Sequence, residues 1–486
     1  MININEEALG KNVERDADNY LKRYKGQMAL LEKSPLSKVR SITPYDYYQL
    51  GKQLEAFEIY RSICEDDGTL TQLGKIPDVA FDVISVSYGT SPIGVCASIQ
   101  AIPEERGTIY FKNILSQTTR GNVTDGDKFF DPRAAADTHP REFASACQTR
   151  LEFEDTTAYG HLLYDYTVPA ALRPIRPYTV VVSMTTDAGV LLTATDDGNG
   201  YLIGYDIQGR VNYVNGGVAI ELSDDPGDAN TIYLDFQQDM AAATDIPQIY
   251  MNLESDSIMA CVYALKETIG LEASYALRRR FGMIAEDELA SDLIAAINAE
   301  IMNTCIYNLV NAHAVWTANV HTINWINTAG AGVSYFEHKQ SFKDAVMRAE
   351  NMMLGLAGRG TISVMIAGRS AASIIGTLPG FTKISDGNTL GPHIYGTLDG
   401  ITIVRVPSNA VLNATHVLCI YKGTSPFEAA AIYAPYMPLV VTSALPTGAN
   451  PLLSQKAAAV WAAQKVVVPN FVTRIVITGF DTMFTV

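Results

Sequence analysis

The sequence predicts an α+β protein organised around one long amphipathic helix. Apolar residues recur at helical spacing through residues 286–310. Short strand-type runs separated by turn signals fill residues 159–240, and helical and strand patterns alternate between residues 361 and 421. A long helix, a β-rich block and an α/β layer in one chain indicate an α+β architecture.

The long helix is predicted from two adjacent rows of apolar side chains. The first row repeats every four residues: Leu289, Leu293, Ile297, Ile301, Cys305 and Leu309. The second row runs beside it: Ala290, Ile294, Met302, Ile306 and Val310. Acidic residues 286–288 suit the positive end of the helix dipole. At about 1.5 Å per residue the helix would be roughly 40 Å long, so it is either an ordinary core helix or a strut that spans a thin subunit.

Composition indicates a folded, soluble protein. The 486 residues are 48% hydrophobic and 18% charged, which is enough for a sizeable core and two to four domains. The net charge of −16 argues against a surface made to bind nucleic acid. Long uncharged stretches at 84–103, 303–336 and 429–455 are interrupted by Pro, Gly, Asn, Ser or His, so we expect no membrane span. The acidic N-terminus does not resemble a signal peptide.

The cysteines form no CxxC pair, and we expect them to be reduced, buried and without a chemical role. The six are Cys64, Cys96, Cys147, Cys261, Cys305 and Cys419.

The N-terminal part, residues 1–78, is highly charged and predicts two helices, at 14–25 and 44–63, the second opened by Thr43 and a proline. Such a segment is either a solvated face or an arm that reaches a neighbouring subunit. Strands are expected next at 81–88, 95–102 and 108–111, followed by a long polar loop over 116–155.

Regular strand signals then predict an all-β block that forms a small sandwich or a twisted tongue. The expected strands are 178–184, 190–194, 201–205, 210–214, 218–222 and 231–236.

Helices and strands alternate in the remainder of the chain. Helices are expected at 253–282, 341–356 and 370–377, and strands at 361–366, 401–406 and 416–421. The last segment, 429–486, is strand-rich and ends in a strand at 474–478.

No motif for catalysis or for cofactor binding is present. The glycine-rich segment 355–360 is interpreted as a helix stop, not as a phosphate loop. The acidic turns 125–127 and 196–200 are interpreted as tight turns, since neither matches a calcium loop. The histidines are scattered; His313 and His321 lie eight residues apart but without an acidic or cysteine partner. We therefore predict no catalytic, cofactor-binding or metal-binding residue.

The order of these parts, with four short motifs, resembles the major capsid proteins of T-even-type tailed bacteriophages, which have the Hong Kong 97-type fold. The segment 271–280 (Leu-Glu-Ala-Ser-Tyr-Ala-Leu-Arg-Arg-Arg) and the start of the long helix resemble that family's helix pair. Residues 421–423 (Tyr-Lys-Gly) and 429–439 are similar to its tyrosine-lysine-glycine and tyrosine-alanine-proline-tyrosine signature. Residues 91–94 (Ser-Pro-Ile-Gly) stand where the family has a proline–glycine pair. The segment 451–480 departs from the family pattern.

The resemblance implies a specific domain layout. It comprises an N-terminal arm (1–78), first peripheral-domain strands with an extended loop (79–158) and a β-rich insertion (159–250). A peripheral domain with the spine helix (251–335), an axial domain (336–430) and peripheral return strands (431–486) follow.

The resemblance also implies a function. It predicts a non-enzymatic major capsid protein, made and assembled in a bacterial cytoplasm, that forms hexamers and pentamers of an icosahedral or prolate head shell. Expected partners are other copies of the chain and scaffold, portal and decoration proteins, with packaged DNA enclosed but not specifically bound, and no membrane. Alternatives are a vertex-specific paralogue, a nanocompartment shell, a tail sheath protein and, least favoured, an enzyme. Members of the family are often trimmed at the N-terminus, and the Met1 start favours an arm that is kept.

Overall fold

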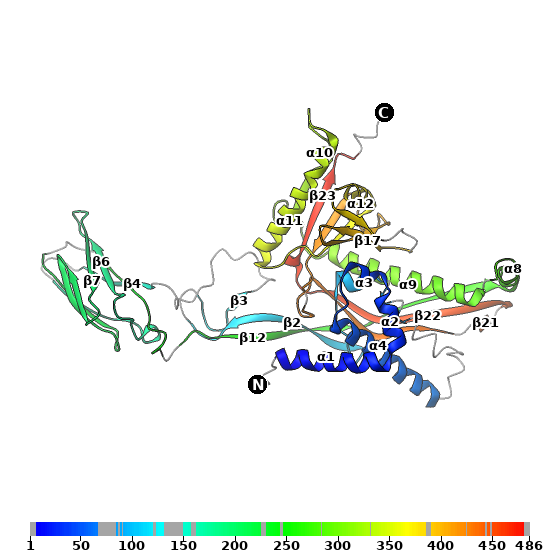
Figure 1. The fold of residues 1–486 in the computed structure, drawn as a ribbon, viewed down its shortest axis with the longest axis horizontal. Coiled ribbons are helices and arrows are strands. Elements are labelled where there is room, and N and C mark those ends of the chain that lie inside the picture. The colour runs from blue at the N-terminus through cyan, green and yellow to red at the C-terminus, as the bar shows by residue number, and fades with distance from the viewer. Residues whose placement is uncertain are drawn as a thin grey trace. The chain divides into compact units, whose positions relative to one another are not determined.

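The computed structural model divides the chain into two compact units, which are described separately (Figure 1). The first unit comprises Met1–Lys112, Pro132–Ala136 and Leu253–Val486, and the second comprises Asn113–Asp131 and Asp137–Asn252. The structure describes residues 6–66, 84–85, 88–89, 91–119, 123–130, 149–156, 162–224, 230–243, 246–282, 284–330, 332–384, 390–423, 425–442, 445–447 and 450–480.

The N-terminal part of the first unit is helical, as the sequence predicts. Its helices are α1 (Glu6–Arg23), α2 (Lys25–Glu32), α3 (Pro35–Val39) and α4 (Pro44–Asp66). α1 packs against α4, and Tyr20 on α1 donates a hydrogen bond to Glu55 on α4 over 2.7 Å. Buried Leu31, Leu50 and Leu54 join these helices to the main core of the unit.

One sheet of the first unit contains three long strands, β13, β20 and β22, and two short ones, β1 and β21. Its order is β1-β20-β22-β13, and β21 pairs with β22 off this path. The strands are β1 (Ser98–Ile99), β13 (Cys261–Gly270), β20 (Ala431–Val441), β21 (Leu445–Thr447) and β22 (Asn450–Val466). β13 and β22 are antiparallel in continuous register from the Cys261–Ala462 pair to the Gly270–Leu453 pair.

The long helix α9 (Ala285–Val310) packs across this sheet, against β13 and β22. The first predicted apolar row is confirmed, because all six of its side chains are buried. By length and composition alone, its segment Glu288–Val310 could cross a membrane. The burial of the apolar row on the sheet accounts for that composition. The short helix α8 (Leu271–Phe281) precedes α9, and Gly282 ends it in the left-handed conformation.

The second half of the first unit holds a mixed sheet ordered β14-β23-β19-β15-β18-β17-β16. Its strands are β14 (Thr322–Ile326), β15 (Val364–Gly368), β16 (Phe381–Lys383), β17 (His393–Leu398), β18 (Ile401–Val406), β19 (His416–Ile420) and β23 (Val472–Thr478). The accompanying helices are α10 (Tyr335–Gln340), α11 (Phe342–Ala357) and α12 (Arg369–Ile375). Alternate residues of β15 enter different cores, since Val364 and Ile366 join the main core and Met365 packs with α11.

Two strands carry the chain between the units: β2 (Arg106–Ser116) outward and β12 (Ile249–Met259) back. They are neighbours in a small sheet that also contains β3 (Lys128–Phe130). β12 and β13 correct the sequence interpretation, which placed a helix over 253–282. Only Leu271–Phe281 of that range is helical.

The main body of the second unit is one antiparallel sheet ordered β4-β11-β6-β7-β8-β9-β10-β5. The strands are β4 (Thr149–Asp155), β5 (Leu163–Thr167), β6 (Val181–Thr185), β7 (Leu191–Asp196), β8 (Tyr201–Gly204), β9 (Ile207–Asn212), β10 (Gly217–Leu222) and β11 (Thr231–Phe236). The end strands β4 and β5 contact each other, so the sheet curls around its own core. The predicted all-β block is confirmed, as a single curled sheet and not a two-sheet sandwich.

Two further sequence expectations near residue 90 need correction. The strand expected at 81–88 falls partly outside the described residues, and the described residues 84–85 and 88–89 are helical. The strand expected at 95–102 is shorter, because Ile93–Cys96 form a helical turn, α7, before β1. Much of the polar loop expected over 116–155 lies outside the described residues.

Candidate functional site

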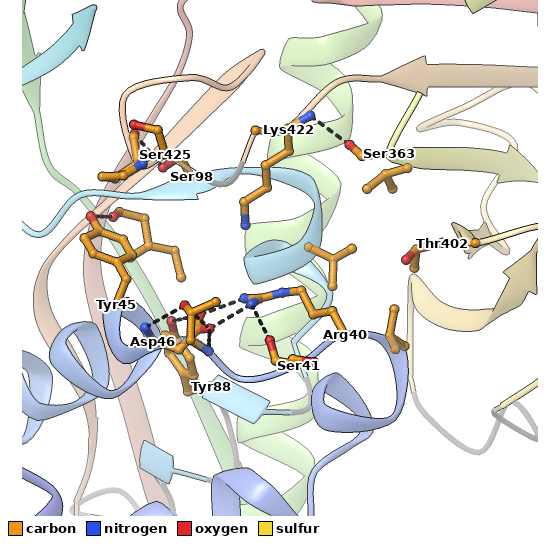
Figure 2. A pocket seen from close by; sticks show the side chains of 18 residues that line it. Arg40, Ser41, Tyr45, Asp46, Tyr88, Ser98, Ser363, Thr402, Lys422 and Ser425 are labelled. Carbon is orange, nitrogen blue, oxygen red and sulfur yellow. Dashed lines mark hydrogen bonds and ion pairs between the residues drawn. The ribbon is translucent and has the colours of Figure 1, made fainter. Parts of the chain in front are cut away.

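A cavity of about 340 Å³ in the first unit gathers charged and hydroxyl side chains from distant parts of the chain (Figure 2). The segment between α3 and α4, the start of β1 and the loop after β19 surround it. Its polar lining residues are Arg40, Ser41, Thr43, Tyr45, Asp46, Tyr88, Ser98, Ser363, Thr402, Lys422 and Ser425. The cavity lies where the helical N-terminal part meets the rest of the unit.

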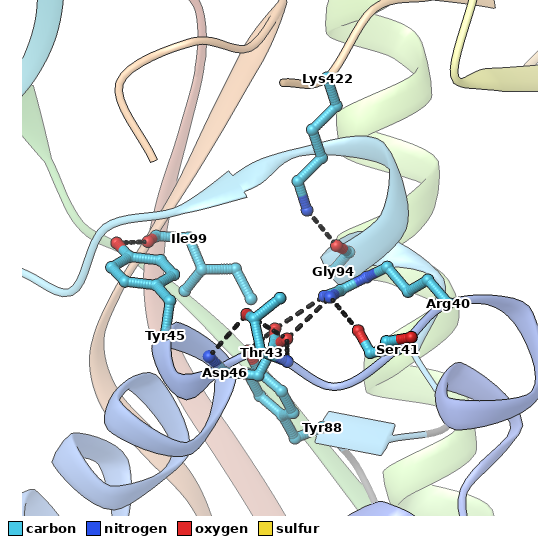
Figure 3. A network of polar contacts seen from close by, with 9 residues as sticks. All are labelled: Arg40, Ser41, Thr43, Tyr45, Asp46, Tyr88, Gly94, Ile99 and Lys422. Atoms are coloured by element: carbon cyan, nitrogen blue, oxygen red, sulfur yellow. Dashed lines mark hydrogen bonds and ion pairs between the residues drawn. The ribbon is translucent and has the colours of Figure 1, made fainter. Parts of the chain in front are cut away.

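Asp46 is held by a dense set of hydrogen bonds at one side of the cavity (Figure 3). Both of its carboxylate oxygens accept hydrogen bonds from the two terminal nitrogens of Arg40, each over 2.7 Å. The backbone N–H and the hydroxyl of Thr43 also donate to it, over 2.9 and 2.8 Å. Burial alone would raise the pKa of Asp46, but the bonds and charge of Arg40 and the Thr43 bonds outweigh it, so the pKa is lowered.

The Thr43–Asp46 contact is a helix N-terminal capping arrangement. Thr43 precedes the first residue of α4, and Asp46 reaches back to its backbone N–H while Thr43 Oγ1 accepts the N–H of Asp46 over 3.4 Å. Pro44 occupies the first helical position, where a missing N–H costs nothing. The sequence therefore contained the signal for this end of the cavity.

Lys422 enters the cavity from the opposite side, after β19. Its backbone N–H donates to the Ser363 hydroxyl over 2.8 Å, and its ammonium donates to the carbonyl oxygen of Gly94 (Figure 3). Burial and the positive charge of Arg40 lower the pKa of Lys422 to about 8. Within the described residues, the ammonium of Lys422 therefore has a backbone carbonyl as its acceptor and no carboxylate.

The lining groups do not form a proton-transfer pair. Burial raises the pKa values of Tyr45 and Tyr88, so both phenols stay neutral at physiological pH. The Tyr45 hydroxyl donates to the carbonyl oxygen of Ile99 over 2.6 Å. Asp46 accepts from Arg40 and Thr43, so it is not poised as a base. The arrangement can hold segments together and can attract an anion.

The two histidines singled out in the sequence do come together. The ring centroids of His313 and His321 are 3.9 Å apart, and His313 Nε2 lies 3.0 Å from the carbonyl oxygen of Val472. Burial lowers the pKa of each histidine. No group of three potential metal ligands occurs in the part of the chain that the structure describes. His139 and His161 lie outside that part.

The acidic and glycine-rich segments are turns. In the 196–200 turn, Asp197 accepts the backbone N–H groups of Asn199 and Tyr201 over 2.8 and 3.0 Å, which lowers its pKa. In the 125–127 turn, Asp127 accepts the N–H of Thr124 over 3.0 Å. Gly358 ends α11 in the left-handed conformation, so the predicted helix stop in 355–360 is confirmed.

Three of the cysteines are buried thiols, as expected: Cys96, Cys305 and Cys419. Burial raises the pKa values of Cys305 and Cys419 to about 12, which makes them unreactive. Cys261 is exposed, contrary to expectation, because it starts β13 at the edge of its sheet. The side chains of Cys64 and Cys147 lie outside the described part.

The comparison with protein families decides the identity. The model of the family described as "Major capsid protein Gp23" matches residues 184–458, more than half of the chain. The chain belongs to this family. It is therefore a bacteriophage capsid protein, a structural component of the virion, as the sequence motifs predicted.

Individual relatives are distant. The major capsid protein of Vibrio phage KVP40 (isolate Vibrio parahaemolyticus/Japan/Matsuzaki/1991) is 25% identical over 390 residues, which are 74% of this chain and 68% of the relative. The capsid of jumbo bacteriophage PhiKZ is 9% identical, with a TM-score of 0.41 over 80% of this chain and 92% of that chain. The Microbacterium phage Oxtober96 structure is 12% identical, with a TM-score of 0.30 over 68% and 95%. These TM-scores are low, so the family match carries the assignment.

Proposed function

We propose that this capsid protein has the Hong Kong 97-type fold and forms the hexamers and pentamers of an icosahedral or prolate head shell that encloses packaged DNA. The observation that carries the proposal is α9, a helix of 26 residues that lies across the long paired strands β13 and β22. A spine of this kind stiffens a broad sheet without a thick globular core. The family membership supports the shell-forming role.

The proposal assigns a role to each part of the chain. Residues 1–78 form the N-terminal arm, 79–158 the first peripheral strands and the extended loop, and 159–250 the β-rich insertion. Residues 251–335 and 431–486 form the peripheral domain, and 336–430 form the axial domain. The helices α11 and α12 on the mixed sheet support the last assignment.

Exposed apolar side chains support repeated self-association. α8 has no buried residue, and its Leu271, Tyr275 and Phe281 are 65%, 63% and 69% exposed. On the outer side of the curled sheet, Leu191 and Ile203 are 65% and 61% exposed. Large exposed apolar side chains that cluster on one element mark contact surfaces. In a shell built from one protein, other copies of the chain would cover them.

The charge of the chain supports DNA that is enclosed but not bound. A net charge of −16 repels the phosphate backbone, which lets a packaged polymer slide along the wall. We infer that the protein acts without catalysis or cofactor, that it is made in a bacterial cytoplasm, and that scaffold, portal and decoration proteins are its other partners. We infer no membrane partner.

The test compares assembly of the purified full-length chain with that of a Tyr275→Ser/Phe281→Ser double variant. Sedimentation velocity and electron microscopy should show capsomers or closed shells for the natural sequence and mainly single subunits for the double variant. Both side chains are exposed, so the thermal unfolding of the subunit should not change. Glu272→Gln on the same helix is the matched control and should assemble normally.

Other outcomes would indicate a different function. A natural chain that stays monomeric at all concentrations would contradict the proposal. Contractile tubes would indicate a tail sheath protein, isolated pentamers a vertex-specific paralogue, and shells that enclose protein cargo a nanocompartment. Normal assembly of the double variant would show that the interface lies away from α8.

A further inference from the structure

The cavity between the N-terminal helices and the loop after β19 holds more positive than negative charge. Two cations, Arg40 and Lys422, and one carboxylate, Asp46, line it. Asp46 is hydrogen-bonded to Arg40 and Thr43. Its charge raises the pKa of Lys422, but burial and the charge of Arg40 outweigh this effect. The thiol of Cys96, which also faces Lys422, stays neutral because burial raises its pKa.

The hydrogen-bond donors that face the cavity are not all used. The ammonium group of Lys422 has three N–H bonds, and among the described residues it donates one of them, to the carbonyl oxygen of Gly94. The Nε–H of Arg40 has no acceptor among the described residues, but it is closed off from the open space of the cavity, so Arg40 contributes its charge there and not a free donor. Thr402, a buried residue of β18, lines the cavity, and its hydroxyl has no hydrogen bond to the described chain. Unmatched donors in a confined space are costly unless an acceptor fills it.

The two cations extend toward each other across the cavity. Figure 2 shows Lys422 extending into the cavity from above toward Arg40, with Thr402 at the side. Each cation raises the energy of the other across the space, as the effect of Arg40 on the pKa of Lys422 indicates. A bound anion would replace this repulsion with two attractions. Lysine and arginine, with hydroxyl donors, are the groups that proteins use to hold oxyanions.

We propose that this cavity binds a small free oxyanion of the phosphate class between Lys422, Arg40 and Thr402. A volume of about 340 Å³ suits a small ligand with its water and not a protein segment. The anion would connect the loop before α4 to the loop after β19, and so fix the N-terminal helices to the body of the capsid subunit. This ligand goes beyond the proposed shell function and does not depend on it.

The experiment titrates inorganic phosphate into the purified full-length chain at constant ionic strength, with chloride as the balancing ion. Thermal unfolding and isothermal titration calorimetry report the binding. Phosphate should raise the unfolding temperature to a saturating limit, because it binds the folded state. Lys422→Met should abolish this rise, and Thr402→Val should weaken the affinity several-fold. Lys266→Met, which removes an exposed lysine from β13, is the matched control and should bind as the natural chain does.

A pH series gives a readout that needs no variant. Binding requires protonated Lys422, and burial with the charge of Arg40 lowers its pKa to about 8. The affinity should therefore fall roughly tenfold between pH 7.5 and pH 9 by proton linkage, although free phosphate becomes more fully the dianion over the same range. If Lys422→Met does not fold, this series and Thr402→Val decide the question.

Three results would overturn the proposal: no saturable effect of phosphate on the natural chain, equal affinity in Lys422→Met, or an affinity that does not change with pH. A 5′-phosphorylated dinucleotide, tested in the same way, separates a free ion from a DNA end. Binding of the dinucleotide without binding of phosphate would also contradict a small-ion site.

Discussion

Asp46 connects three pieces of chain through one carboxylate. It caps α4 through Thr43, receives two hydrogen bonds from Arg40, and lies 3.5 Å from the hydroxyl of Tyr88. Asp46 is only 4% exposed, so its negative charge is stable there only because these donors surround the carboxylate. Removing the charge should therefore leave Arg40 without its counterion.

We expect Asp46→Asn to lower the free energy of unfolding at pH 7 by about 3 kcal/mol, the cost of breaking a buried ion pair. The folded pKa of Asp46 lies below its ordinary value of 3.8. A depressed pKa stabilises the folded state above the ordinary value, and this stabilisation is lost as the pH falls through the folded pKa. The difference in the free energy of unfolding between the natural chain and the variant should thus be constant from neutral pH to about pH 5 and shrink below pH 4. Urea unfolding over this range measures it.

The control for this prediction is Asp399→Asn. Asp399 pairs with Lys343 over 2.7 Å, but its side chain is 54% exposed, so the loss should be below about 1 kcal/mol. Its φ of +49° suits asparagine as well as aspartate. An equal loss in both variants would mean that the Arg40–Asp46 pair is no stronger than a surface contact.

The sequence could predict only half of this site. The start of α4 is predictable from four residues, because Thr43, Pro44 and Asp46 form a typical helix N-terminal pattern. Lys422 lies in the Tyr-Lys-Gly motif at 421–423, which indicates the family but not where the side chain points. It shares the cavity with Arg40 only because the mixed sheet places the loop after β19 beside the loop before α4. Convergence of residues that are distant in sequence depends on tertiary packing, and a single sequence does not encode it in any local pattern.

At the scale of elements, β13 shows where local patterns fail. Residues 261–270 include Ala, Leu, Lys and Glu, which favour helices, and the sequence interpretation assigned them to one. In the structure they pair with β22 through ten consecutive positions. Strand propensity depends on cross-strand neighbours more than on the residue itself, so a partner far along the chain outweighed the local preference. α9 was predictable because its signal lies within its own residues.

The burial of α9 gives a second prediction. Ile297 is fully buried between the helix and the sheet, in the main core of the first unit. Ile297→Asp places a charge there with no partner, and we expect it to cost about 3 kcal/mol or more. Chemical denaturation and the yield of soluble protein measure the effect.

Ser291→Asp is the matched control, because it adds the same charge on the exposed side of the same helix. Its effect should lie within about 0.5 kcal/mol of zero. Normal stability of Ile297→Asp would mean that the apolar row of α9 does not face the sheet.

At the scale of the whole molecule, the hydrophobic core is divided. The curled sheet of the second unit has a core of its own, and none of its members belongs to either core of the first unit. The strand signals between residues 159 and 240 predicted this block well. Neighbouring antiparallel strands are recognisable from local patterns, namely alternating apolar and polar residues separated by turn residues. The closure of the sheet was not predictable, since it depends on whether the two end strands of the sheet, β4 and β5, contact each other.

This division predicts that residues 149–243 fold as an isolated fragment. All eight strands of the sheet and its whole buried core lie within this range, so excision removes no strand partner. The fragment should give a β-type circular dichroism spectrum, dispersed amide resonances and one cooperative thermal transition, at the temperature of one of two transitions in the full chain. Phe236→Asp, which places a charge at a fully buried position on β11, should abolish folding of the fragment, whereas Tyr201→Asp on the exposed side of β8 should be tolerated. A fragment without cooperative unfolding would show that the sheet depends on the rest of the chain, and the insertion could then fold only after the first unit.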